Sequence, residues 1–77
     1  MEFKVGDKYK QEYNCIGEKI DTISTIMSPM NERGLIRVVN KRIIYRNGEK
    51  IKTVFELMLT PEFLENRINL GYMEKIN

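Results

Sequence analysis

Apolar and polar positions alternate over two stretches in the second half of the chain, residues 36–45 and 50–59. Both stretches are rich in β-branched and aromatic residues, which favour strands. Asn47 and Gly48 lie between them. Asn-Gly is the leading short-range hairpin signal, because both residues tolerate positive φ in a type I′ turn. The pattern therefore predicts a central β-hairpin.

A two-residue loop would place Arg46 opposite Glu49 and so fix which side chains share a face. One face is mainly apolar and is the predicted core face, although Asn40 and Arg42 lie in its middle. Because buried polar groups need partners, we expect these two residues either to lie at an open edge or to bond the N-terminal segment. The predicted core face carries Ile36, Val38, Asn40, Arg42, Ile44, Ile51, Thr53, Phe55, Leu57 and Leu59.

The opposite face of the hairpin mixes basic side chains with Val39, Ile43, Val54 and Met58. A sheet with one solvated face usually alternates more cleanly between apolar and polar positions. Two interpretations follow. Either the N-terminal strands fold over this face and close a small barrel, which is the preferred interpretation, or another chain covers it.

Residues 8–27 fit two patterns. Apolar side chains recur at spacings of four and three residues, as in an amphipathic helix. Gly17 and the β-branched residues between 20 and 26 oppose a helix. We predict two strands, 9–15 and 19–27, with a long helix over 8–27 packed on the hairpin as the alternative.

The C-terminal part contains the signals of a short helix over 61–70. Thr60 is a good N-cap, Pro61 suits the first helical position, and Gly71 is placed to end the helix. Residues 72–76 would form a last short strand or an ordered tail. The predicted fold is α+β: one domain, 1–77, with a mostly antiparallel twisted sheet or partial barrel of four or five strands and one C-terminal helix.

Composition excludes several classes of protein. The chain has no His, the commonest general base and metal ligand, and no Gly-rich phosphate loop, so we expect neither an enzyme nor a cofactor or metal site. The lone Cys15 cannot form an internal disulfide and is expected to be a small buried residue. No apolar run reaches the roughly 20 residues of a membrane span, and the first residues lack a signal-peptide layout. These features predict a cytoplasmic protein that does not contact a membrane.

Basic residues are concentrated in the hairpin. The chain holds 13 Lys and Arg against 11 Asp and Glu, but residues 31–53 hold seven basic residues against two acidic ones. Such a surface can neutralise phosphates or an acidic protein, and an aromatic ring beside it can stack on a base. A solvated sheet face is the alternative interpretation. The candidate partner-binding or nucleic-acid-binding residues are Arg33, Arg37, Lys41, Tyr45, Lys50 and Lys52.

The chain opens with Phe3-Lys4-Val5-Gly6-Asp7-Lys8-Tyr9, has a β-rich middle, and closes with Thr60-Pro61-Glu62-Phe63-Leu64 and then Gly71-Tyr72. In these segments it resembles short accessory proteins of phages and prophages of Gram-positive bacteria.

The resemblance implies a small sheet with a C-terminal helix and no transferable site residue. It also implies a non-enzymatic protein that binds and modulates, as an inhibitor, a host macromolecule through protein contacts. The expected partner is a host or phage protein, contacted through the basic hairpin face and the loop from Met30 to Gly34. The alternatives are a nucleic-acid-binding regulator that uses the same basic face, and a structural component that assembles with its own copies.

Overall fold

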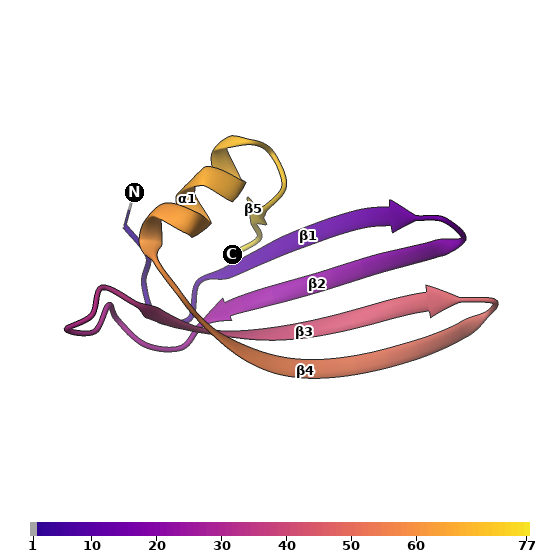
Figure 1. Cartoon of the computed structure of the whole chain (residues 1–77), viewed down its shortest axis with the longest axis horizontal. Coiled ribbons are helices and arrows are strands. Elements are labelled where there is room, and N and C mark those ends of the chain that lie inside the picture. Colours follow the sequence, from indigo (N-terminus) through magenta and orange to yellow (C-terminus); the bar gives the residue numbers. More distant parts are fainter. Residues whose placement is uncertain (1) are drawn as a thin grey trace.

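Four long strands follow one another along the chain and pair as an antiparallel meander in the computed structural model, which describes residues 2–77 (Figure 1). A short helix and a two-residue strand follow, and the sheet order is β4-β3-β2-β1-β5. The predicted α+β class with a mostly antiparallel sheet is confirmed. The elements are β1 (Lys8–Cys15), β2 (Glu18–Ile26), β3 (Ile36–Arg46), β4 (Glu49–Leu59), α1 (Pro61–Asn69) and β5 (Glu74–Lys75).

The central hairpin has the predicted turn and register. Asn47 and Gly48 adopt φ of 49° and 80°, which a type I′ turn requires at both positions. Arg46 pairs with Glu49, and the pairing continues without interruption to Ile36 and Leu59. Local turn chemistry therefore fixed which residues of β3 and β4 share a face.

Residues 8–27 form β1 and β2, so the alternative of a long helix is wrong. Gly17 takes φ of 73° in the turn between the strands, a conformation that opposes a continuous helix. The helix-like spacing is a coincidence of two strands and a turn. Tyr9, Tyr13 and Ile20 share one face of the sheet by register, whereas Ile16 lies in the turn.

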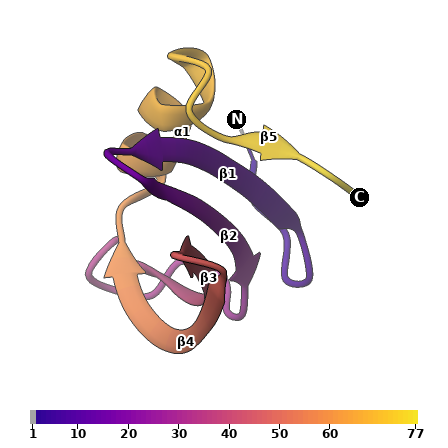
Figure 2. The same ribbon diagram turned by 90° about the vertical axis from the view of Figure 1, so that its right-hand side faces the viewer.

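The sheet curls into an open trough, with α1 on its hollow side near β1 (Figure 2). The sheet does not close into a barrel, and the expectation that the N-terminal strands fold over the basic hairpin face is wrong. β2 instead pairs edge to edge with β3 and extends the same sheet. We call the side that carries Tyr9, Asn40 and Phe55 the concave face, and the side that carries Lys41 and Val54 the convex face.

The core lies at one end of the concave face, beneath α1. Thr60 caps the helix by accepting a hydrogen bond from the Phe63 N–H at 3.2 Å, as predicted, and Leu64 is the buried residue of the helix. The helix spans about 14 Å, whereas β3 spans about 36 Å. It covers only the end where the strands meet the core, and it is too short to cross a membrane. The buried core consists of Tyr9, Ile26, Ile36, Val38, Leu64 and Met73.

Side chains toward the two hairpin turns lie beyond the reach of the helix. Tyr13 and Ile51 are exposed on the concave face, and Ile16 is fully exposed in the turn between β1 and β2. Cys15 is exposed as well, so the expectation that it is buried is wrong. These side chains are exposed because the strands extend beyond the part of the sheet that α1 covers.

Asp7 connects the N-terminal turn to the last strand. Its carboxylate accepts a hydrogen bond from the Lys4 N–H at 3.0 Å and lies 3.5 Å from the Lys75 ammonium. The backbone hydrogen bond from Lys4, aided by the charge of Lys75, lowers the pKa of Asp7 below its ordinary value of 3.8. The ionised carboxylate thus stabilises the folded state.

Asp7→Asn should therefore make the free energy of unfolding less sensitive to a fall in pH. A depressed folded-state pKa gives stability that is present above the unfolded value of 3.8 and is lost as pH falls through the folded value. Urea unfolding from neutral pH to about pH 3 should show wild type losing its advantage over the variant as the solution becomes acidic. Glu32→Gln, which removes an exposed loop carboxylate without altering the contacts of Asp7, is the control for the charge change. A constant gap between wild type and Asp7→Asn would contradict this role.

Candidate functional site

Five of the six sequence-predicted site residues lie together on the convex face. Register places Arg37, Lys41 and Tyr45 of β3 on the same side of the sheet as Lys50 and Lys52 of β4. The sixth, Arg33, lies apart in the exposed loop between β2 and β3. The hairpin register thus assembles most of the predicted basic surface.

Partners within the chain reduce the positive field of that surface. The Arg37 guanidinium forms an ion pair with Glu56 at 2.8 Å. The Tyr45 ring lies between the ammonium groups of Lys19 and Lys50, 5.9 and 5.7 Å from its centroid. This ring already has cationic partners and is a poor platform for a base.

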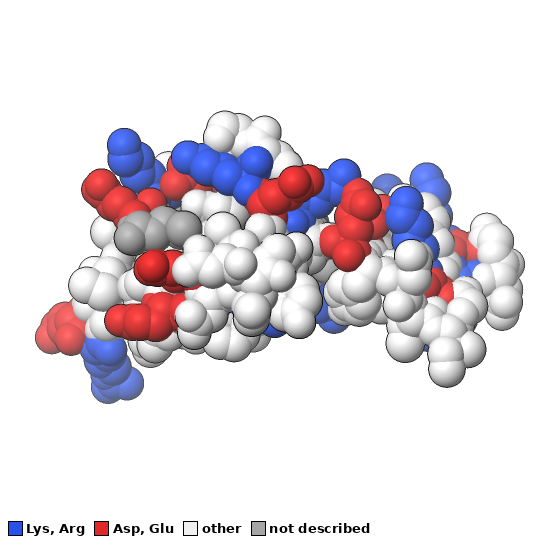
Figure 3. Space-filling model, turned by 90° about the horizontal axis from the view of Figure 1, so that it is seen from above, with Lys and Arg blue, Asp and Glu red and all other residues white. Residues whose placement is uncertain are grey.

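The charges elsewhere are also mixed in sign. Seen from the side of α1, Lys and Arg alternate with Asp and Glu and with uncharged surface (Figure 3). Lys10 and Glu12 form an ion pair whose hydrogen bond raises the pKa of the lysine and lowers that of the glutamate. In this view the charged side chains form no large patch of one sign, which is what steers a polyanion to a protein surface.

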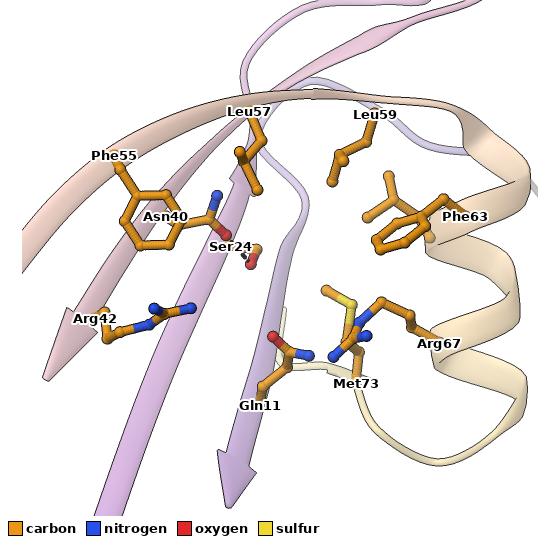
Figure 4. Close-up of a pocket in the computed structure, with 11 residues that line it drawn as sticks. Gln11, Ser24, Asn40, Arg42, Phe55, Leu57, Leu59, Phe63, Arg67 and Met73 are labelled. Atoms are coloured by element: carbon orange, nitrogen blue, oxygen red, sulfur yellow. Dashed lines mark hydrogen bonds between the residues drawn. The ribbon is translucent and has the colours of Figure 1, made fainter. Parts of the chain in front are cut away.

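The concave face contains a cleft that the sequence did not predict as a site. It has a volume of about 160 Å³ and lies between α1 and the curling strands β3 and β4 (Figure 4). Its polar side is formed by Gln11, Ser24, Asn40, Arg42 and Arg67. Its apolar walls are Phe55, Leu57, Leu59, Phe63, Leu64 and Met73.

Asn40 and Ser24 are the two buried polar residues of the cleft, with 5% and 3% of their surface exposed. The Oδ1 of Asn40 accepts a hydrogen bond from the Ser24 hydroxyl at 2.5 Å, which confirms that this position bonds the N-terminal strands. Its Nδ2 is buried and has no hydrogen-bond partner within residues 2–77. Buried amide groups are nearly always hydrogen-bonded in native proteins, so a donor without an acceptor at the cleft wall points to a missing acceptor.

Arg42 and Arg67 bring two guanidinium groups to the same cleft. Arg42 donates from Nε to the Thr22 hydroxyl at 3.4 Å and lies 4.7 Å from the centroid of the Phe55 ring. Both contacts hold the side chain along the wall, while its Nη atoms make no hydrogen bond within residues 2–77.

Arg67 reaches the cleft from α1 and lies 5.6 Å from the ring centroids of both Phe63 and Tyr72. With the Gln11 amide turned so that Oε1 faces Arg67, Nε donates to this oxygen at 3.1 Å. The cleft lining contains no carboxylate. It therefore suits a ligand that joins an apolar group to an acceptor or an anion.

The sequence predicted the part of this cleft that lies on β3 and β4, but not the part that α1 contributes. The hairpin register places Asn40, Arg42 and Phe55 on one face, and this placement was predicted. The position of Arg67 depends on where α1 lies on the sheet, and neither capping nor periodicity defines that docking. The sequence signal that could have indicated the cleft was the pair of hydrogen-bond donors, Asn40 and Arg42, on an otherwise apolar face.

Comparison with known proteins leaves function open: no family model, no curated protein and no solved structure matches this chain. Within residues 2–77, no group of three or more Cys, Asp or Glu side chains could hold a metal ion. Function is therefore inferred from the chemistry of the two faces of the sheet.

Ser24→Ala should destabilise the fold by about 1–3 kcal/mol, because it removes the partner of the Asn40 carbonyl oxygen in a buried site. Replacing both partners with apolar groups is often nearly neutral, so Ser24→Ala combined with Asn40→Leu should recover part of the loss. Urea unfolding checks both variants, and Thr53→Ala, at an exposed position of β4, is the control. A double variant whose loss exceeds that of Ser24→Ala would contradict the pairing.

Proposed function

We propose that this chain is a non-enzymatic binding protein whose concave cleft receives an apolar side chain of a partner protein together with a neighbouring acidic group. The observation that carries the proposal is the buried, unpartnered Nδ2 of Asn40 beside two guanidinium groups and apolar walls. Each part of this donor set favours an acceptor, and the walls favour a hydrophobic anchor.

The size of the cleft limits the anchor. About 160 Å³ is close to the roughly 150 Å³ of an engineered protein cavity that admits benzene. One aromatic ring or one branched aliphatic side chain would fill it. A carboxylate attached to that anchor would accept charge-assisted hydrogen bonds from Arg42 or Arg67.

A protein partner fits better than a small metabolite, because a second apolar stretch lies beyond the polar row of Gln11, Thr22, Arg42 and Thr53 that borders the cleft. Tyr13, Ile20, Ile44 and Ile51 form one row across the concave face, on the side of the cleft away from the core. Tyr13 and Ile51 in that row are exposed. An extended segment of a partner would cover this row while its anchor fills the cleft.

The finer hypothesis, a phage or prophage accessory protein that inhibits a host macromolecule, rests on the sequence resemblance and stays a prediction. The expected contact surface now changes from the convex face to the concave one. Arg37 and Tyr45 of the convex face already have partners within the chain, whereas Asn40 in the cleft lacks one.

The cleft can be tested with three capped tetrapeptides, Gly-Phe-Asp-Gly, Gly-Phe-Asn-Gly and Gly-Ala-Asp-Gly, followed by NMR chemical-shift changes. The first should bind with a dissociation constant on the order of millimolar, as expected of a single anchor, and should shift signals of cleft residues. Removal of the charge or of the ring should weaken binding about tenfold each.

Matched variants locate the effect. Arg42→Gln and Arg67→Gln should remove the preference for Asp over Asn, whereas Arg33→Gln makes the same charge change at an exposed loop residue outside the cleft lining and should not. Equal binding of all three peptides, or shifts confined to the convex face, would refute the cleft as the site.

Nucleic-acid binding is a second candidate function, favoured by the clustering of five predicted residues on the convex face. If it holds, affinity for mixed DNA and RNA fragments should fall steeply between about 50 and 200 mM salt, because bound counterions are released. Combined replacement of Lys41, Lys50 and Lys52 by Glu should abolish binding, and Arg67→Gln should leave it largely intact. Fluorescence anisotropy measures both, and absence of binding at the lower salt would exclude this function.

A further inference from the structure

β4 is a long edge strand, and no strand within the described residues pairs along its outer side. It is the first strand in the sheet order, its 11 residues pair with β3 only, and Figures 1 and 2 show it as the free border of the trough. Edge strands attract other strands unless proline, a bulge or charge prevents it. β4 contains no proline, and its one-to-one pairing with β3 contains no bulge.

The turn geometry shows which backbone groups of β4 face outward. In a two-residue hairpin the flanking residues, here Arg46 and Glu49, exchange hydrogen bonds, and such pairs recur at every second residue. The odd-numbered residues of β4 therefore direct their N–H and C=O groups to β3. The outward groups belong to Lys50, Lys52, Val54, Glu56 and Met58.

We propose that β4 pairs antiparallel with β4 of a second copy of this chain, about a twofold axis at Val54. In this register the whole strand from Glu49 to Leu59 is paired, because Val54 is its central residue. In this register each outward-facing residue lies opposite another outward-facing residue, so about ten main-chain hydrogen bonds can form. Lys52 lies opposite Glu56 of the second copy, and Glu56 opposite Lys52.

The side chains of this register are complementary as well. Val54, 66% exposed, lies against Val54 of the second copy on the convex face. On the concave face Ile51 and Leu57, 38% and 43% exposed, lie opposite one another in both halves of the pair. Directly opposed apolar and opposite-charge pairs are the side-chain contacts that stabilise antiparallel sheets.

Neighbouring registers are less complementary. An axis moved two residues toward the turn would oppose Lys52 to Lys52, and like charges directly opposite destabilise a sheet. An axis at Thr53 would oppose Lys50 to Glu56 but Lys52 to Val54, an axis at Phe55 would oppose Val54 to Glu56, and both leave part of β4 unpaired. The charge pattern and the full pairing of the strand together favour a closed dimer about Val54, the isologous twofold arrangement common among soluble proteins.

The dimer can be tested by sedimentation equilibrium over a range of concentrations. The expected mass is about twice the 9.1 kDa of the chain. Val54→Pro should make the protein monomeric, because it removes an outward N–H at the axis while leaving the bonds to β3 intact. Val54→Thr keeps that N–H and the β-branched shape, and should remain dimeric. Circular dichroism checks that both variants are folded.

Charge exchange tests the register itself. Lys52→Glu alone and Glu56→Lys alone should each raise the dimer dissociation constant about tenfold, because each opposes like charges at two symmetric places. The two substitutions combined should restore dimerisation to within about threefold of wild type. A wild-type protein that is monomeric at every concentration, or a combined variant no better than the single ones, would overturn the proposal. Peptide binding to the cleft is a separate readout, because none of these substitutions alters a cleft residue.

Discussion

One short helix covers one end of a long, curled sheet, and the other features of this protein depend on that mismatch. The buried apolar side chains gather where Leu64 of α1 meets Ile26 and Val38. Beyond that contact the strands are held mainly by their antiparallel pairing, because no second layer lies over them. A domain of this size buries too little surface to stabilise a larger cover, so the core and the exposed sheet coexist in one chain.

The cleft lies at the boundary between these two regions. There the concave face changes from apolar residues packed under the helix to a polar row of Gln11, Thr22, Arg42 and Thr53 across the strands. Ser24 and Asn40 sit on the covered side of this boundary and bond to each other, and the Nδ2 group of Asn40 has no hydrogen-bond partner within residues 2–77. An unpaired polar group in such a site is costly, so it favours a ligand that brings an acceptor.

Local signals in the sequence predicted most of the fold. Asn47-Gly48 fixed the hairpin and its register, and Thr60 and Pro61 fixed the start of the helix, because each acts within a few residues of itself. Barrel closure was predicted wrongly, because the pattern of two-sided apolar residues does not distinguish a covered face from an uncovered one. The cleft was missed for a related reason: Arg67 joins Asn40 only through the docking of α1, a contact between parts of the chain that no local pattern links.

The positions of the exposed apolar residues on β4 indicate what kind of partner could cover them. Ile51 and Val54 are on opposite faces of β4, so no single layer added to the sheet can cover both. A strand added at the edge contacts both faces at once, because its side chains alternate in the same way as those of β4. The exposure of apolar side chains on both faces of β4 is therefore better explained by a strand that pairs along its edge than by a layer packed on one face. The rest of the concave row, Tyr13, Ile20 and Ile44, faces the hollow of the trough instead and stays open to a different partner.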